Sequence, residues 1–413
     1  MRILPILLLT LCSPAPAQVE SRTAAIERAR NEKQAQLEPD TPGKWEQRLI
    51  YLKEKKLLER LSSGLAGFRL KIGGMPTGGG FALGPDYFRE DLARGELFLN
   101  ASAQASGNRW TKIQLHFAAP AFASNRLFWR LQGVRQDFNS MQYYGPGPDS
   151  EKINRSNYRL EDSSLDTAFG VKPVKWFSLG AGAGYQFINT GPGLNDDFIS
   201  TEKKFPDVPG IVRQTNFFRW GAFAQFDWRD SQLGPRGGGN YSIRFDDYND
   251  QQLGLHSFRR LDIDLQQYIP FFNKRRVFAL RAQSLLTFTN PGHSVPFFHQ
   301  AVLGGSDQLR GYRPYRFYDD NMLALNAEYR WETFSGLDMA VFADAGKVFP
   351  RRSQLNFHDL ESAVGFGFRF NARNSTFLRL DFGFSHEGFQ IWVKFSDLFT
   401  QRPFGVSNAA HLF

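Results

Sequence analysis

The sequence lacks the residues and motifs on which most enzymes and metalloproteins depend. It has one cysteine in 413 residues, Cys12, which excludes a disulfide framework and a cysteine metal site. It has no Gly-x-Ser-x-Gly nucleophile motif, no His-Glu-x-x-His pair and no phosphate loop ending in Gly-Lys-Ser/Thr. His293 and His299 are close in sequence, but both fall in an expected loop and are interpreted as ordinary loop histidines. We therefore expect neither an enzyme nor a bound cofactor or metal.

A long apolar run is also missing beyond the N-terminus. Ile3–Leu11 is apolar, but it has only about half of the ~20 residues that a membrane-spanning helix needs. Arg2 precedes it and the small residues of Ala15–Ala17 follow it, which is typical of a secretory signal peptide over residues 1–17. The formal charge of +9 on an exported chain favours outer-membrane lipid and lipopolysaccharide over nucleic acid as neighbours.

Residues 18–63 differ in composition from the remainder of the chain. They are charged and helix-prone, and Thr41 followed by Pro42 is typical of the start of a helix. Apolar side chains then recur at helical spacing from Trp45 to Leu61. This pattern predicts a helical periplasmic segment with one apolar face. Two interpretations remain open: a linker helix, or a plug at the mouth of the domain that follows.

From Gly64 onward, segments of eight to fourteen residues alternate apolar and polar side chains between Gly/Asn/Asp/Pro turns. The alternation predicts an all-β domain over residues 64–399, with about sixteen antiparallel strands and a tail at 400–413. Long gaps are expected at 138–156, 189–214 and 290–320. The strands are expected to start near residues 67, 79, 94, 109, 125, 157, 175, 215, 238, 255, 275, 321, 337, 360, 375 and 388.

Alternation alone fits two folds, a soluble β-sandwich and a transmembrane β-barrel. In the segment 376–384, Arg379 and Asp381 alternate with Leu378, Leu380 and Phe382, so one face is charged and the other apolar. In a sandwich the apolar face is the core, whereas in a barrel it faces lipid. An export signal, ~10-residue segments and an even strand count favour the barrel.

Aromatic residues cluster near the ends of these segments. Such clusters are typical of the interfacial girdles of a transmembrane barrel, so we expect them to face lipid headgroups. The clusters are Tyr143-Tyr144, Trp176-Phe177, Phe217–Trp220, Phe271-Phe272 and Phe297-Phe298.

The segment LGGSDQLRGYRPY (Leu303–Tyr315) combines a Gly-Gly pair with Arg-Gly-Tyr. It resembles the Gly-Gly and Arg-Gly-Tyr/Phe loop signature of the bacterial surface antigen family, whose members include the outer-membrane proteins BamA and TamA. FDWRDSQLGPRGG (Phe226–Gly238) resembles its Arg-Asp strand end, and VFADAGKVF (Val341–Phe349) its Phe-x-Asp-x-Gly strand. Ala363–Phe384 resembles its penultimate hairpin, and Gln142–Ser150 fits a weaker upstream element. The likeness covers roughly residues 67–399.

The resemblance implies a candidate site in the barrel lumen. In the family, the loop arginine folds inward and meets acidic residues on strands twelve and thirteen. The matching positions are Arg310 as donor, with Glu328 and Asp344 as acceptors. A shielded lumen strengthens such contacts, and guanidinium bridges two carboxylates well. The remaining motif residues are Gly304, Gly305, Gly311 and Tyr312 in the loop and Arg229, Asp230 and Gly346 at strand ends.

The resemblance also implies insertion or translocation of polypeptides, or of lipids, at the bacterial outer membrane. Members of the family carry polypeptide-transport-associated domains of ~75 residues before the barrel, and the ~46 residues of 18–63 are too few for one. We therefore expect a barrel lacking these domains, with polypeptide clients and a separate periplasmic partner. The alternative is a passive channel or structural barrel without insertase activity.

Overall fold

The computed structural model describes residues 67–395, except for 74, 77, 125, 373 and 374. The expected signal peptide, helical segment and C-terminal tail lie outside the described residues. Within this range, none of the helices combines the length and the apolar character that a transmembrane helix requires. The helical content consists of four-residue α4 (Thr201–Lys204) and short 3-10 turns such as η3 (Phe297–His299).

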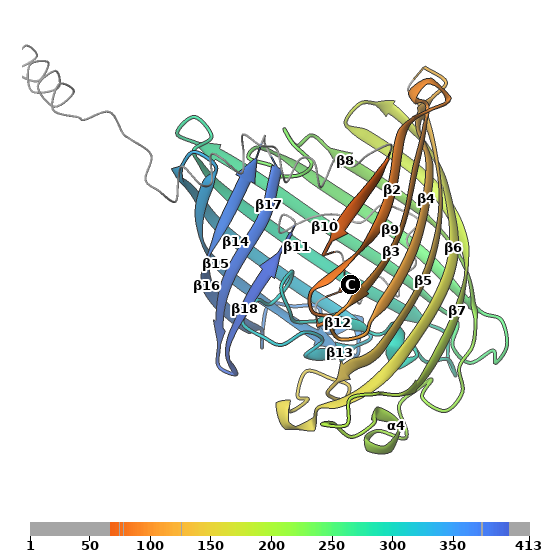
Figure 1. The fold of residues 1–413 in the computed structure, drawn as a ribbon. Helices are drawn as coiled ribbons and strands as arrows, with labels where there is room; N and C mark the ends of the chain where they lie inside the picture. The colour runs from red at the N-terminus through yellow and green to blue at the C-terminus, as the bar shows by residue number, and fades with distance from the viewer. Residues whose placement is uncertain (1–66, 74, 77, 125, 373–374, 396–413) are drawn as a thin grey trace, which may run out of the picture. The chain divides into compact units, whose positions relative to one another are not determined.

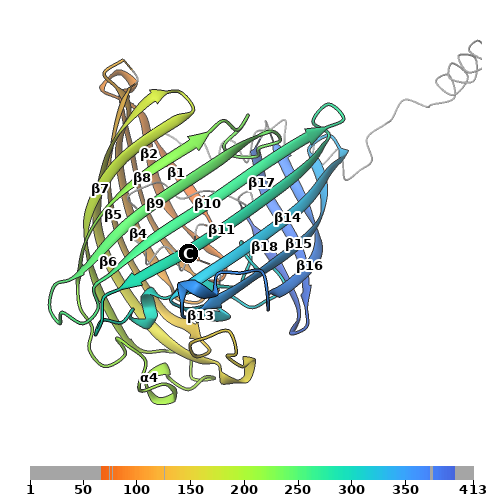
Figure 2. The same cartoon turned by 180° about the vertical axis from the view of Figure 1, so that it is seen from behind.

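The described chain forms one sixteen-stranded antiparallel sheet that curls into a barrel, as Figures 1 and 2 show from opposite sides. Each strand begins within three residues of its expected position, which confirms the predicted fold class and strand count. The strands are β1 (Phe68–Ile72), β2 (Ala82–Leu92), β3 (Leu97–Ser106), β4 (Thr111–Phe122), β5 (Leu127–Tyr143), β6 (Ser156–Val174), β7 (Phe177–Pro192), β8 (Phe217–Asp227), β9 (Gly238–Asp250), β10 (Phe258–Phe271), β11 (Arg276–Thr289), β14 (Asn321–Phe334), β15 (Leu337–Phe349), β16 (Glu361–Ala372), β17 (Ser375–Ser385) and β18 (Gly388–Lys394).

The strands place their polar and charged side chains inside the barrel and large apolar side chains outside, whereas a soluble sandwich buries its apolar side chains. In β8, Phe217 and Arg219 are buried inside the barrel, whereas Phe218 and Trp220 are 40% and 48% exposed on the outside. The same holds around the wall, where large apolar side chains are exposed and charged ones are buried. An outer surface of this kind is stable in lipid, which distinguishes the barrel from the sandwich.

The connections differ at the two ends of the barrel. Short turns join the strands at the end where β1 begins and β18 finishes. The other end carries the long loops, at 144–155, 193–216, 290–320 and 350–360. Long loops are typical of the outward-facing end of such barrels. β5, β6 and β7 have 17, 19 and 16 residues and extend beyond the ~9–11 that a tilted strand needs to cross the bilayer.

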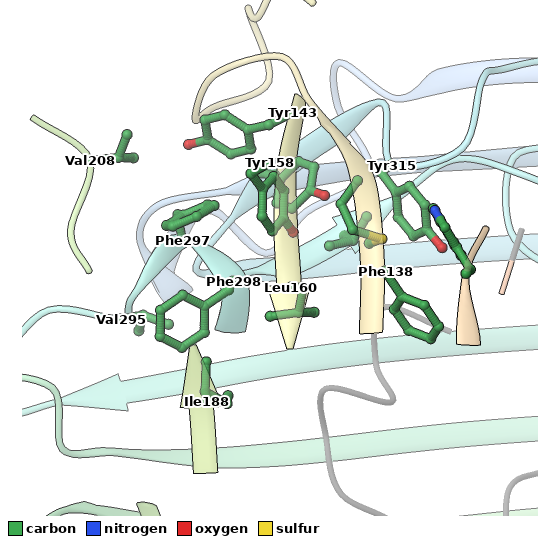
Figure 3. Packing of buried hydrophobic residues seen from close by; sticks show 14 of the residues in the cluster. Phe138, Tyr143, Tyr158, Leu160, Ile188, Val208, Val295, Phe297, Phe298 and Tyr315 are labelled. Atoms are coloured by element: carbon green, nitrogen blue, oxygen red, sulfur yellow. The ribbon is translucent and has the colours of Figure 1, made fainter. Parts of the chain in front are cut away.

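Aromatic residues fill the interior beneath the long loops (Figure 3). Tyr143 packs edge-on against Tyr318 and Phe297, with ring centroids 4.8 and 5.5 Å apart. The expected assignment of Tyr143-Tyr144 and Phe297-Phe298 to a lipid-facing girdle is therefore wrong, because all four side chains are buried. They lie on the inward face of a strand end or on an inward-folded loop, where they close the barrel from above.

The first and last strands are the two ends of the sheet. In the described part of the chain, no backbone ladder joins β1 to β18, and both appear on the near side of the barrel in Figure 1. They approach each other at their C-terminal ends: a Cβ built on Gly73 would lie 3.7 Å from the Cβ of Phe395. We call this junction between the two unpaired strand edges the seam.

Candidate functional site: the luminal loop and the seam

Residues 290–320, here called the luminal loop, connect β11 to β14 through the interior of the barrel. The loop contains η3 and a small hairpin of β12 (Ala301–Leu303) and β13 (Phe317–Asp319). Gly304 and Gly305 follow β12 with φ of +121° and +91°, conformations that favour glycine. They turn the chain so that residues 306–316 run along the inner wall. Apolar loop side chains then pack against the wall strands: Leu303, Leu309, Tyr312 and Phe317 meet Leu285, Met322, Val348 and Ala363.

Arg310 lies at the innermost part of this loop and is fully buried. Its Nε and Nη2 donate to the two oxygens of Asp344, each at 2.8 Å, and its Nη1 donates to Glu328 Oε2 at 2.5 Å. The guanidinium also lies 3.4 Å from the ring centre of Phe342. Burial alone would lower the pKa of Arg310, but the carboxylates of Asp344 and Glu328 together raise it above its ordinary value. Arg310 therefore remains charged in a shielded environment.

Three more arginines join this group to form what we call the arginine cluster. Arg369 bridges two acids, with Nη2 2.7 Å from Glu328 Oε2 and Nη1 2.6 Å from Asp381 Oδ1. Arg330 donates to Glu328 Oε1 at 2.7 Å. Arg379 lies 3.0 Å from Asp381 and donates to Asp307 of the loop at 2.8 Å. The cluster connects the loop to β14, β15, β16 and β17.

Sequence alternation places Arg379 and Asp381 on the polar face of their strand, but their partners were missed. Alternation gives the face of a residue and not its neighbours across the sheet. The register supplies them, because Gly367 pairs with Asp381 and Arg369 with Arg379 on adjacent strands. Asp381 Oδ1 lies 2.2 Å from the position that a Cβ at residue 367 would occupy, so a glycine there gives the carboxylate room.

The loop backbone touches the barrel wall directly beside Arg310. A Cβ on Gly383 of β17 would lie 2.3 Å from Arg310 O, and one on Gly311 would lie 2.7 Å from the backbone of Phe384. Only glycine at both positions allows this approach. Tyr312 then donates its hydroxyl to Glu361 at 2.6 Å. Burial, assisted by this hydrogen bond, raises the pKa of Tyr312.

The loop also contacts both sides of the seam. On one side, Trp392 Nε1 of β18 donates to Arg310 O at 2.7 Å, and Lys394 Nζ lies 3.7 Å from Asp307. On the other side, the ring of Tyr315 packs on the loop between β1 and β2, 3.6 Å from a Cβ built on Gly78. Tyr315 has a φ of +55°, which is uncommon for an aromatic residue. The loop thus links two strand edges that share no ladder within residues 67–395 as described.

The strand-end motif residues lie elsewhere in the barrel. Arg229 pairs with Asp227 at the lower end of β8, with two contacts of 2.8 Å. Asp230 accepts the backbone N–H groups of Arg236 and Gly237 at 3.0 and 3.1 Å and so shapes the β8–β9 turn. Neither lies in the arginine cluster.

Gly346 is different, because it lies under the luminal loop. A Cβ at this position would be 3.2 Å from Leu303 Cδ2 and 2.6 Å from Leu323 O. Glycine there lets β12 pack closely against β15.

The β8–β9 turn also reaches the far wall of the barrel. Arg236 Nη2 donates to both oxygens of Asp338 on β15, each at 2.6 Å, and Thr376 N of β17 donates to Leu233 O at 2.9 Å. Since β10, β11 and β14 separate β9 from β15 in the sheet, this turn crosses the lower mouth of the barrel. Side chains and backbone of the chain itself therefore occupy the lumen at both ends.

Comparison with known proteins agrees with this architecture. BamA from Haemophilus ducreyi, in a structure lacking POTRA domains 1-3, is similar with a TM-score of 0.58 at 14% identity, over 79% of this chain and 69% of that one. CdiB from Escherichia coli is similar with a TM-score of 0.52 at 12% identity, over 80% and 60%. These identities are low, so the likeness concerns the fold. No curated protein matches at the level of sequence.

The match to a family model covers most of the barrel. The Omp85 superfamily domain matches residues 95–395. This range includes fourteen of the sixteen wall strands, β3 to β11 and β14 to β18, together with the whole luminal loop. This sixteen-stranded barrel of the bacterial outer membrane belongs to the Omp85 superfamily.

Proposed function

We propose that this barrel inserts or translocates polypeptides at the outer membrane, and that the seam is the place where it acts. The family is one of outer-membrane polypeptide insertases and translocators. The observation that carries the proposal is the pair of strand edges on β1 and β18, which are unpaired among the described residues and are held by contacts with the luminal loop. A strand edge without a partner offers a row of backbone donors and acceptors to an incoming strand.

The lengths of the two edge strands support the same proposal. Among the described residues, β1 has five and β18 has seven, fewer than the ~9–11 that a tilted strand needs to cross a bilayer. A short wall compresses the adjacent bilayer and lowers the cost of inserting there. The contents of the lumen favour this lateral route over passage through the centre, because the arginine cluster and the β8–β9 turn occupy the interior.

A seam that can be locked tests the proposal. The Cβ positions of residues 73 and 395 are 3.7 Å apart, within the ~3.5–4.5 Å range of disulfides. We expect the Gly73→Cys/Phe395→Cys protein in liposomes to speed the insertion of an unfolded outer-membrane barrel when reduced and to lose that activity when oxidised. Since Gly73 has a φ of +75°, the single Gly73→Cys variant is the control for strain.

Two results would contradict the proposal. Equal activity of the oxidised and reduced forms would mean that clients do not use the seam. Activity no higher than that of empty liposomes in every form would identify a passive or structural barrel. Planar-bilayer conductance that rises on removal of the loop segment around Arg310 would then support the passive channel.

A further inference from the structure

Residues 350–359, in the loop between β15 and β16, fold over the outside of the barrel. By alternation, Lys347 and Phe349 share the outward face of β15 with the exposed Val341, yet they are only 8% and 2% exposed. The loop covers them, since Lys347 Nζ donates to Asn356 Oδ1 at 2.5 Å and to His358 O at 3.2 Å. We call residues 350–359 the collar loop, because it lies against the outer wall at the end that carries the long loops.

The collar loop reaches as far as β11. The guanidinium of Arg352 lies 4.0 Å from the ring centre of Phe288, which shares the outward face of β11 with the exposed Phe278 and Leu280. Arg259 of β10 is the register partner of Phe288, so their Cβ atoms are about 5 Å apart. The Arg259 side chain is 49% exposed and donates to Asn290 at 3.2 Å. Two arginines therefore adjoin Phe288 at the upper edge of the apolar outer wall.

The cations of this region have few acidic partners. Among the described residues, no carboxylate lies within 4.0 Å of the charged groups of Lys347, Arg351 or Arg352, and Arg259 is 3.9 Å from Asp247. The exposed Arg351 and Arg352 therefore leave positive charge on the surface beside the membrane.

The opposite rim, on β5 and β6, shows the contrast. There Arg159 makes two hydrogen bonds to Asp137, at 2.9 and 2.6 Å, and lies 3.0 Å from Glu161. Arg135 is 3.8 Å from the same Glu161. The charges of this rim are balanced within the protein itself.

The collar loop also exposes apolar side chains beside its cations. Leu355 and Phe357 are 43% and 73% exposed. Apolar side chains next to arginines are stable at the boundary between hydrocarbon and headgroups, where the apolar part enters the acyl region and guanidinium binds phosphate. The exposed apolar side chains and the arginines of the collar loop lie directly above the lipid-facing outer wall. This position argues for a lipid as the partner.

We propose that the collar loop, together with Arg259, binds phosphate-bearing lipid headgroups of the outer leaflet. Arg259 and Arg352 contact the phosphate, while Leu355 and Phe357 enter the acyl layer. This binding is independent of the polypeptide activity proposed above, because it lies on the outer wall of β10, β11 and β15.

The test uses the full chain in nanodiscs of a zwitterionic phospholipid containing bisphosphorylated lipid A. Native mass spectrometry measures lipid A bound per barrel. We expect Arg259→Gln/Arg352→Gln to weaken lipid A binding at least about tenfold, because each arginine near an anionic surface contributes severalfold. Arg135→Gln/Arg159→Gln makes the same change of charge on the balanced rim and is expected to stay within about twofold of the original protein. Heat-modifiable gel mobility confirms that each variant is folded.

A second variant keeps the test valid if the arginine variant does not fold. Leu355→Ser/Phe357→Ser changes only exposed side chains, and it is expected to weaken lipid A binding severalfold. Equal losses in the collar and control arginine variants would overturn the proposal, since they indicate general charge attraction. If millimolar inorganic phosphate displaced lipid A completely and Leu355→Ser/Phe357→Ser bound lipid A as well as the original protein, the site would bind phosphate rather than a lipid.

Discussion

β5 and β6 are joined in a different way from β1 and β18. The first pair shares a ladder from Leu127 opposite Val171 to Tyr143 opposite Ser156. The second pair shares none in the described part of the chain and is linked through a few side-chain contacts with the luminal loop, made by Trp392, Lys394 and Tyr315. Backbone hydrogen bonds tolerate most substitutions, whereas a link made by a few side chains depends on each of them. The seam can therefore be altered by single substitutions that the rest of the wall would tolerate.

The largest effect is expected from Arg310→Ala. This change leaves Asp344 and Glu328 without their shared partner in a buried site, where losing one member of an ion pair costs about 3–5 kcal/mol. Urea unfolding in detergent micelles measures the change in the free energy of unfolding. Arg275→Ala is the control: this turn arginine is 78% exposed, and we expect its loss to cost about 0–1 kcal/mol. Equal losses in both variants would contradict a special role for the cluster.

The cluster is also expected to act as one unit. Glu328→Gln and Asp344→Asn both remove charge next to Arg310, so the free-energy change of the double variant should differ from the sum of the single changes by about 0.5–3 kcal/mol. Asp230 at the lower turn supplies the control. Glu328→Gln combined with Asp230→Asn should be additive within about 0.5 kcal/mol. An additive result for the first pair would mean that the two acids hold Arg310 independently.

Contact between the loop and the wall depends on Gly383. A Cβ there would overlap Arg310 O at 2.3 Å, so Gly383→Ala should displace the loop and destabilise the barrel by about 1–3 kcal/mol. Limited proteolysis of the loop and urea unfolding report the two effects. Gly191→Ala, near the end of β7, has nothing within 4 Å of its added Cβ and is expected to change stability by less than about 0.5 kcal/mol. Similar proteolysis in both variants would argue against close packing at Gly383.

The sequence predicted the positions of the strands well, but it predicted fewer of the contacts between side chains on adjacent strands. Period-two alternation follows from the geometry of a strand with two unlike sides, so the strands begin within three residues of the expected positions. The contacts of Arg310 with Glu328 and Asp344 were anticipated from family resemblance. Arg369 and Asp381 were not placed beside them, because cross-strand register depends on turns and bulges that alternation does not determine. The prediction that Tyr143 faces lipid headgroups was wrong for a related reason. An aromatic residue at a strand end fits an outward-facing girdle and an inward-facing interior cluster equally well, and the sequence does not distinguish them.

The smallest effect is expected from Trp392→Phe, which tests directly whether the luminal loop holds β18 at the seam. Trp392→Phe keeps the aromatic ring on β18 and removes the hydrogen bond to Arg310 O, which should cost about 0.5–1.5 kcal/mol. A cost of ~1 kcal/mol changes an opening equilibrium about fivefold. In the Gly73→Cys/Phe395→Cys background, the disulfide should therefore form more slowly. Trp176→Phe is the control, since Trp176 is 45% exposed on the outer surface and distant from the loop in sequence. If both variants form the cross-link at the original rate, the loop does not hold β18, and the short β1 and β18 must stay together by the contact of their ends alone.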